Sequence, residues 1–203
     1  MSRRLPRAYW RQFTATTVSN LGDGANAAAM PLLAARLTDD VRLIASVSFV
    51  GMLPWLVLSL PAGVLIDRWR RTDVMIAAEW ARAALYLAVA FLVAVDALTI
   101  WVLLAILLAI GCAAVFYDMT AQAFIPDIVP AESLERANGL LYASEIICNG
   151  FIGLPVGAWL FVVAAAVPFG VNGLSFALAA VLVAGTARNL PRAEPAEIGR
   201  AHV

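Results

Sequence analysis

Long apolar segments without a charged side chain constrain this chain more than any other feature of its sequence. Residues 43–66, 97–117 and 146–187 contain no Asp, Glu, Lys or Arg. A helix of about 20 largely apolar residues crosses the roughly 30 Å hydrocarbon core of a membrane. At about 1.5 Å per residue, a helix over residues 146–187 would be about twice that long, so we expect the chain to turn back at Pro168-Phe169-Gly170.

The overall composition also indicates a membrane protein. Hydrophobic residues make up 63% of the 203 residues, charged residues only 14%, and the mean hydropathy is +0.85. A soluble domain is about half apolar and about a quarter charged, so this chain lacks the polar surface that a soluble domain needs. The 14 Lys and Arg balance the 14 Asp and Glu, so we expect the lipid bilayer as a partner and no nucleic acid.

Two further apolar regions, and an upstream extension of the fifth span that includes Glu145, complete the predicted set of helices. We predict an all-α integral membrane fold, a six-helix bundle within residues 1–190, with helices at about 10–36, 43–66, 74–95, 97–119, 137–163 and 168–187. The first segment resembles a signal peptide, but Asn20, Asp23 and Asn26 lie where a signal peptide is purely apolar. We therefore expect a retained first helix whose polar groups face protein rather than lipid.

The distribution of arginines predicts the orientation, because cytoplasmic loops of membrane proteins are enriched in positive charge. If the N-terminus is inside, the outer loops carry only Arg36 and Arg42, beside Asp39 and Asp40. We predict a multi-pass protein of the cell (inner or plasma) membrane with both termini of this chain in the cytoplasm. The arginines on the inner side are then Arg3, Arg4, Arg7, Arg11, Arg68, Arg70, Arg71, Arg136, Arg188 and Arg192.

The end of the chain has the composition of a linker. Residues 191–203 are expected to be the start of a polar cytoplasmic linker. Residues 197–203 (Glu-Ile-Gly-Arg-Ala-His-Val) resemble a translation of the adapter used in short-read DNA sequencing. We expect these last residues to be a cloning or assembly scar, and the gene to continue.

Residues that commonly support catalysis or bind metals are scarce. The chain has no Lys, and its one His is His202. Ser-His and Cys-His nucleophiles, Schiff bases and His-ligated metals therefore lack their components. Cys112 and Cys148 fall in apolar stretches, where we expect small packing residues rather than a disulfide or a metal site. We expect no enzyme activity, no metal and no cofactor.

The sharpest motif joins the second and third helices: Gly63-Val-Leu-Ile-Asp67-Arg68-Trp-Arg70-Arg71. Physically it is a tight inner loop, with a small residue where two helices approach and arginines that can pair with acids or anionic lipids. Its spacing resembles the signature loop of the major facilitator superfamily (MFS). Three other segments look like the drug- and siderophore-exporter branch (enterobactin type) of that family: Leu53-Pro54-Trp55, Ile125-Pro126-Asp127-Ile-Val-Pro130 and Phe169-Gly-Val-Asn172-Gly-Leu-Ser175-Phe176.

The resemblance extends from about residue 7 to residue 191 and covers the N-terminal half of a twelve-helix transporter. It implies that a C-terminal six-helix half is missing and is a partner of this chain. It also implies a conformational gating loop in which Asp67 contacts the second half and Arg71 forms a charge relay with Asp118. Gly63 and Arg68 belong to the same loop, whereas Arg70 stands where the family usually has Gly.

The fifth helix carries glycines at three positions that an α-helix would place on one face, Gly150, Gly153 and Gly157, together with Pro155. This set resembles the Gly-Pro signature of exporters, with one residue between Gly153 and Pro155 where the family has none. The pattern indicates either a hinge for antiport or ordinary close packing of helices.

Ionisable groups inside a membrane span are the default candidates for function. Asp23 lies in the middle of the first helix with Asn20 and Asn26 at three-residue spacing, and Glu145 and Asn149 lie one turn apart in the fifth helix. A carboxylate in a low-dielectric site can take up and release protons near neutral pH. These five residues are candidates for binding a small-molecule substrate or a proton, or they form a structural hydrogen-bond cluster.

One acidic and one basic residue of the third helix are expected to interact with each other. Glu79 and Arg82, at i and i+3, are predicted to form a simple local pair. The fourth helix lacks the arginine that many drug–proton antiporters keep there.

Three hypotheses follow for function. The first is half of an MFS exporter that moves a small amphipathic molecule with the proton gradient by alternating access, and that does not transport without its second half. The second is a six-helix permease subunit of an ATP-driven transporter, which needs a separate ATPase. The third is a membrane-embedded enzyme with an all-carboxylate mechanism on Asp23 and Glu145.

Overall fold

The computed structural model describes residues 5–66 and 69–187, and all structural statements below concern these residues. Asp67 and Arg68 of the predicted gating loop lie outside the described residues. So do residues 191–203, including the predicted scar at 197–203.

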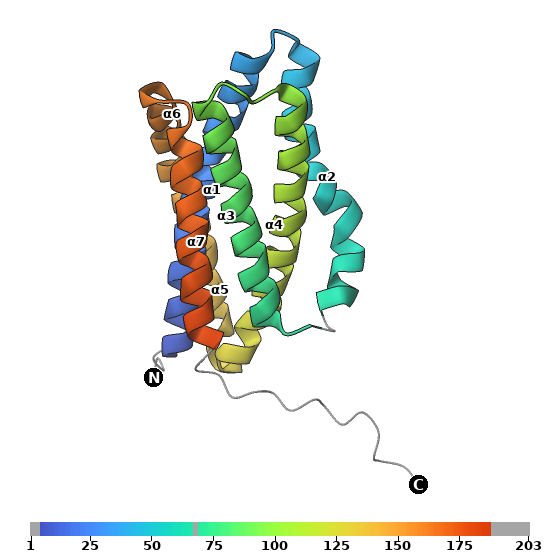
Figure 1. The fold of residues 1–203 in the computed structure, drawn as a ribbon. Coiled ribbons are helices and arrows are strands. Elements are labelled where there is room, and N and C mark those ends of the chain that lie inside the picture. Colours follow the sequence, from blue (N-terminus) through green and yellow to red (C-terminus); the bar gives the residue numbers. More distant parts are fainter. Residues whose placement is uncertain (1–4, 67–68, 188–203) are drawn as a thin grey trace.

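The described chain is a bundle of long helices, as the apolar segments predict (Figure 1). The first four are α1 (Arg7–Leu37), α2 (Val41–Ile66), α3 (Arg71–Ala94) and α4 (Ile100–Ile128). A short 3₁₀-helix, η1 (Ala131–Ser133), leads into α5 (Leu134–Glu145), the π-helix η2 (Ile146–Gly153) and α6 (Leu154–Val163), which follow one another without a break. The last helix is α7 (Val167–Ala187). The prediction of an all-α membrane fold with six helices is confirmed, with α5, η2 and α6 counted as one.

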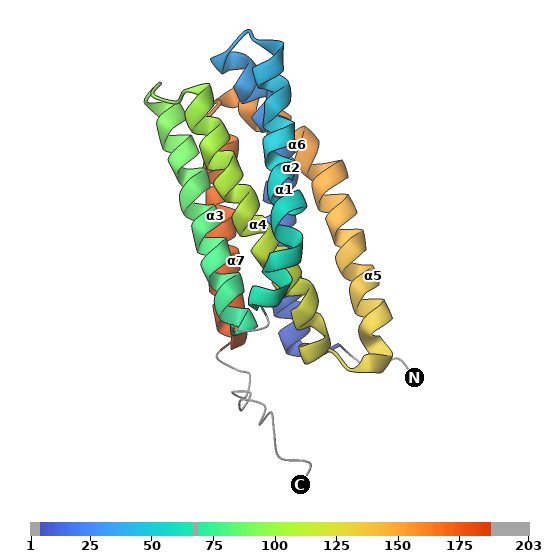
Figure 2. The ribbon, with the colours of Figure 1, turned by 90° about the vertical axis from the view of Figure 1, so that its right-hand side faces the viewer.

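Five helical segments of the described chain are long and apolar enough to cross a membrane: Val41–Gly63, Arg71–Ala94, Ile100–Ile128, Ala131–Val163 and Val167–Thr186. Helix α1 is not among them because it carries many polar residues. Its 31 residues nevertheless give a length of about 46 Å, and it runs alongside the other helices (Figure 2). Gln12, Ser19 and Asn26 of α1 are buried in the protein, so these polar groups face protein, as predicted.

The helices alternate in direction, so that α1 begins and α7 ends at the same end of the bundle (Figures 1 and 2). Helix α1 is central: it contacts α2, α4, α5, η2, α6 and α7. Helix α3 packs between α7 and α4, and α2 packs on α4. The end of α2, the connection 129–133 and the end of α7 thus share the end of the bundle at which α1 starts.

Helix α4 differs most from its predicted bounds of about 97–119. Helix α4 starts at Ile100 rather than residue 97, because the side chain of Thr99 caps it by accepting a hydrogen bond from the Val102 amide. It ends at Ile128 rather than residue 119, because the last two turns bury apolar side chains, among them Phe124, against the start of α1. The prediction ended the helix near residue 119 because the uncharged segment ends just before Asp118.

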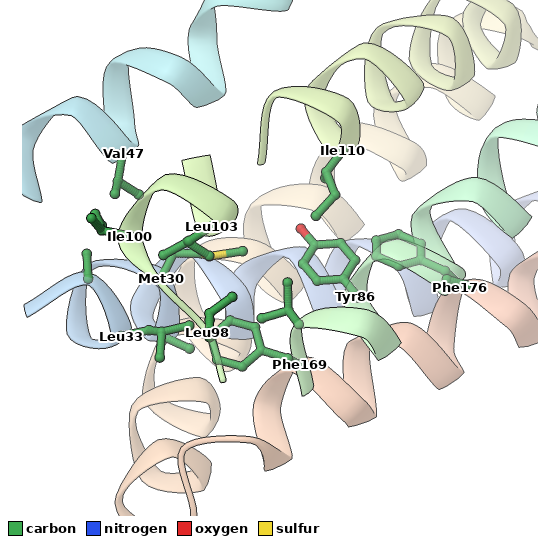
Figure 3. Packing of buried hydrophobic residues seen from close by; sticks show 14 residues of the cluster. Met30, Leu33, Val47, Tyr86, Leu98, Ile100, Leu103, Ile110, Phe169 and Phe176 are labelled. Carbon is green, nitrogen blue, oxygen red and sulfur yellow. The ribbon is translucent and has the colours of Figure 1, made fainter. Parts of the chain in front are cut away.

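The apolar core in the half of the bundle where α1 ends and α7 begins is built on aromatic side chains (Figure 3). Tyr86 of α3 stacks on Phe176 of α7 with ring centroids 5.3 Å apart. Phe169, Leu103 and Met30 belong to the same cluster of buried residues. Because lipid is as apolar as such a core, close packing and polar contacts hold these helices together more than the hydrophobic effect does.

Glycines provide the closest helix contact in the bundle, between α1 and the η2–α6 segment. A Cβ at Gly153 would lie 2.6 Å from the Cα of Gly24, and one at Gly157 would overlap the backbone of Ala25. The two backbones therefore meet directly. By contrast, a Cβ at Gly150 would have no described atom within 4 Å.

The single glycine face predicted for Gly150, Gly153 and Gly157 is therefore wrong for Gly150. The reason is the π-helix, whose wider turn rotates each residue less than an α-helix does and shifts the helical register. Pro155 lies just after this π-helix, at the first turn of α6. Since proline has no N–H to donate to the preceding turn, the wider turn before it leaves less strain. A hinge at this position stays a prediction.

Replacing Gly157 should therefore disturb packing where replacing Gly150 should not. We expect Gly157→Ala to lower the free energy of unfolding by about 1–3 kcal/mol, because the new methyl group meets backbone that cannot move aside. Gly150→Ala is the matched control in the same segment and should be neutral or slightly stabilising. Thermal unfolding of the two variants in detergent measures the difference, and equal melting temperatures would contradict this packing.

Candidate functional site

A polar cavity of about 620 Å³ lies between α1, α2, α4, α5 and the start of η2. It contains four of the five residues predicted as substrate or proton sites: Asn20, Asp23, Glu145 and Asn149. The sequence did not predict two parts of the cavity wall. One is a set of further amide and hydroxyl side chains, and the other is Trp55 of α2. The lining residues are Gln12, Thr16, Asn20, Asp23, Trp55, Tyr117, Asp118, Ala121, Gln122, Ile125, Asn138, Leu141, Tyr142, Glu145 and Asn149.

Three carboxylates from three helices line this cavity. Asp23 comes from α1, Asp118 from α4 and Glu145 from α5. The side chain of Asp23 is 33% exposed, and Asp118 lies close enough to interact electrostatically with both Asp23 and Glu145. A group of three acids in an apolar bundle favours cations and protons over anions.

Asp23 is held by an arginine that the sequence analysis assigned elsewhere. An Nη2 donor of Arg82 on α3 lies 2.6 Å from Asp23 Oδ2. Nη1 of the same guanidinium is 3.9 Å from Glu79 Oε2. The predicted local pair of Glu79 and Arg82 is therefore only the weaker part of a larger network, because the hydrogen-bonded partner of Arg82 is Asp23 on the neighbouring helix.

The network continues away from the cavity into the core. Ser19 of α1 donates a hydrogen bond of 2.9 Å to Glu79 Oε1. The guanidinium of Arg82 lies 3.7 Å from the ring centroid of Phe176 on α7, a cation–π contact. Glu79 is 0% exposed and Arg82 3% exposed. The charged groups thus connect α1, α3 and α7 behind the wall of the cavity.

Asn26 does not share the cavity with Asn20 and Asp23. It is buried, and its Nδ2 donates a hydrogen bond of 2.5 Å to the hydroxyl of Tyr86 on α3. Residues three apart in an α-helix are offset by about 60° around the axis, so a six-residue separation turns Asn26 about 120° from Asn20. The expectation that all three residues share one face fails for this reason.

The predicted relay between Arg71 and Asp118 is replaced by another pair. Among the described residues, Arg71 donates to Asp127, with a distance of 2.5 Å, and to the backbone carbonyl of Ala123 at 2.9 Å. Asp118 lies nine residues before Asp127, a separation of about 13 Å along α4, and lines the cavity instead. Arg71 starts α3 at the end of the bundle, where Asp127 also lies.

The remaining gating residue within the described chain is Gly63. A Cβ at this position would be 3.6 Å from the end of the Met119 side chain, an ordinary van der Waals distance. Gly63 therefore faces α4, but a larger residue would fit there. Within residues 5–66 and 69–187, no group of three or more His, Cys, Asp or Glu is placed to hold a metal ion.

One signal in the sequence points to the missed partner of Asp23. An arginine in the middle of an apolar span needs a negative charge to compensate its own. A glutamate on the same helix does not compensate it on the side that faces a neighbouring helix. Asp23 is the acid at matching depth in the first helix. The aromatic ring above the guanidinium has no comparable signal in the sequence.

Apolar helices around a cavity lined by acidic and polar side chains define a multi-pass membrane protein. The chain belongs to the Major Facilitator Superfamily, whose family model matches residues 13–202. Uncharacterized MFS-type transporters of Mycobacterium tuberculosis and Mycobacterium bovis are each 33% identical over 154 residues, 74% of this chain and 34% of theirs. Macrolide efflux protein A of Enterococcus faecalis is 28% identical over 118 residues, 58% of this chain and 36% of that protein.

These matches cover only part of the known proteins. The chain spans about a third of the length of the curated relatives it matches. The family is one of membrane transporters.

Removing the buried guanidinium should destabilise the protein far more than removing an exposed one. We expect Arg82→Met to lower the free energy of unfolding by about 3 kcal/mol, because Asp23 and Glu79 lose their shared cation within the bundle. Arg70→Met is the matched control, since its pair with Asp73 is 3.5 Å long and both side chains are more than half exposed, and such pairs contribute at most about 1 kcal/mol. The measurement is thermal unfolding in detergent. A similar loss in both variants would refute the structural role of the buried pair.

Proposed function

We propose that this chain is the N-terminal six-helix half of an MFS exporter of the drug and siderophore branch (enterobactin type). It exports a small amphipathic molecule and is driven by the proton gradient. The single observation that carries the proposal is the cavity lined by Asp23, Asp118 and Glu145 within an apolar bundle. The similarity to macrolide efflux protein A supports export as the direction.

The composition of the cavity suits an amphipathic molecule. Trp55 and Tyr142 offer flat apolar surfaces, and amides such as Asn20 and Asn149 offer hydrogen bonds beside the carboxylates. A solute with an apolar body and a polar or cationic group can use both kinds of contact. Trp55 is 41% exposed and Tyr142 65% exposed, so both rings are open to a ligand.

A second six-helix half is part of the proposal. The segments α2 and η2 border the cavity and expose large apolar side chains, such as Met52, Leu56 and Phe151. A second half packed across the cavity would close it from the membrane, and rocking of the halves would open it to each side in turn. On this model, residues 1–203 alone bind a solute but do not transport it.

The proposed location is the cell membrane, with both termini of this chain in the cytoplasm. Arg70, Arg71 and Arg136 lie in or next to the connections at the end of the bundle where α1 begins and α7 ends (Figure 1). The opposite end carries Asp39, Asp40 and Asp96 beside Arg36 and Arg42. The positive-inside rule places the arginine-rich end in the cytoplasm.

Transport should depend on the cavity carboxylate that Arg82 holds. We expect Asp23→Asn in the full-length protein to reduce proton-driven export of a radiolabelled macrolide or of tetraphenylphosphonium at least tenfold, because neutralising Asp23 removes both an anionic contact and its ion pair. Asp39→Asn, in the exposed loop between α1 and α2, is the matched control and should export at the wild-type rate. Accumulation in everted membrane vesicles, with and without an uncoupler, measures export. Equal export by Asp23→Asn and wild type would overturn the proposal.

The orientation can be tested by labelling single cysteines. After Cys112 and Cys148 are replaced by alanine, a cysteine at Asp39 should react in intact cells with a thiol reagent that does not cross membranes. A cysteine at Glu132, in the 3₁₀-helix η1 at the other end, should react only after the cells are opened. The reverse pattern would show that the termini face outward.

A further inference from the structure

One guanidinium lies between two carboxylates in the interior of the bundle. Arg82 is hydrogen-bonded to Asp23 at 2.6 Å, while its other terminal nitrogen is 3.9 Å from Glu79. Asp23 borders the cavity, whereas Glu79 is fully buried and is not among the residues that line it. Among the described residues, no hydrogen-bond donor contacts Glu79 Oε2. The network is therefore open to the cavity at Asp23 and closed to it at Glu79.

The charges of this network do not balance unless a proton is present. An arginine side chain stays charged in a protein, so two ionised carboxylates and one guanidinium leave one net negative charge in an apolar bundle. An uncompensated buried charge is costly, and such a group becomes neutral instead. Asp23 has the guanidinium as a hydrogen-bonded partner and Glu79 Oε2 has none, so Glu79 is the carboxylate of this pair that a proton would neutralise.

We propose that Glu79 carries the coupling proton and that Arg82 transfers between Asp23 and Glu79, so that a cationic substrate bound at Asp23 expels the proton from Glu79. This inference rests on the proposed function, and it assigns the substrate class as lipophilic cations. It places the proton and the substrate on different carboxylates, which communicate through one guanidinium.

The geometry allows this exchange with a small movement. Nη1 of Arg82 must approach Glu79 Oε2 by about 1 Å, from 3.9 Å to an ordinary hydrogen-bond distance. The ring of Phe176, whose centroid is 3.7 Å from the guanidinium carbon, offers a flat surface along which this small movement takes place. The substrate cation replaces Arg82 as the partner of Asp23, so neither carboxylate is left without a positive charge.

The proton step is balanced. The O–H bond of the Glu79 carboxyl breaks, the electron pair stays on the carboxylate, and Arg82 remains protonated throughout. The proton leaves towards the cavity through the hydroxyl of Tyr117, a close neighbour of Glu79 whose oxygen is 3.4 Å from Thr16 Oγ1. Tyr117 and Thr16 both line the cavity, so water in the cavity receives the proton.

Other ionisable groups face this network from the neighbouring helices. Helix α1 contributes Asp23, α4 contributes Tyr117 and Asp118, and Tyr86 lies next to Arg82 on α3. Glu145 of α5 acts on Asp118 rather than directly on Glu79. Asp118 is thus the acid most able to imitate the behaviour of Glu79, and it is the necessary control.

Infrared spectroscopy of the full-length protein in lipid nanodiscs tests the proton site without any substrate. At neutral pH the wild type should show the C=O stretch of a protonated carboxyl group, and Glu79→Gln, which keeps the acceptor for Ser19, should lose it. Asp118→Asn should keep it. Asp23→Asn should also lose it although Glu79 is intact, because Arg82 then pairs with Glu79 and ionises it.

Each result of this experiment decides the matter. A band that survives Glu79→Gln overturns the proton site. A band that is lost in Glu79→Gln but survives in Asp23→Asn overturns the transfer of Arg82. Should Glu79→Gln fail to fold, the Asp23→Asn and Asp118→Asn spectra still test the proposal, since neither changes Glu79.

Proton release on ligand binding tests the coupling itself. In weak buffer, the wild type should release about one proton per tetraphenylphosphonium ion bound. Glu79→Gln should bind this cation without releasing a proton, and release that persists in this variant would overturn the proposal. A wild type that gives the expected infrared spectra but binds no cation would overturn the proposed cation export while supporting the proton on Glu79.

Discussion

Arg82 brings a permanent charge into a bundle surrounded by hydrocarbon, and the packing of α1, α3 and α7 depends on how that charge is compensated. Asp23 compensates it from α1, and the ring of Phe176 covers it from α7. The same bond fixes Asp23 at the wall of the cavity. The interaction that stabilises the fold therefore also fixes one negative charge at the cavity wall and connects that charge to three helices.

Close packing at α1 complements this polar contact. The backbone of α1 meets η2 and α6 directly at Gly153 and Gly157, while its polar side chains turn towards α3, α4 and the cavity. A helix with Gln12, Ser19 and Asn26 buried would be a poor membrane span alone, but here α3 and α4 accept a hydrogen bond from each of these side chains. The central position of α1 follows from its polarity.

The sequence predicted the fold well and the site partly, for identifiable reasons. A membrane-spanning helix can be predicted from the length and composition of one segment, and the local sequence contains both. Depth in the membrane also placed Asn20, Asp23, Glu145 and Asn149 in one cavity. Partners across helices were not predictable in the same way: Arg71 pairs with Asp127 and Arg82 with Asp23, because such pairs depend on helix rotation. The π-helix changed that rotation at Gly150.

The placement of the carboxylates bears on the proposal that this chain is half of a transporter. Asp23, Asp118 and Glu145 lie on three helices of one bundle, so the proposed solute site takes none of these three charges from a second half. Alternating access is a different requirement, because it needs a surface against which this bundle rocks. Glu79 is fully buried on the closed side of the network. On our proposal, a proton on Glu79 reaches the cavity water through Tyr117 and Thr16, which line the cavity, and it responds to the occupant of Asp23 through Arg82.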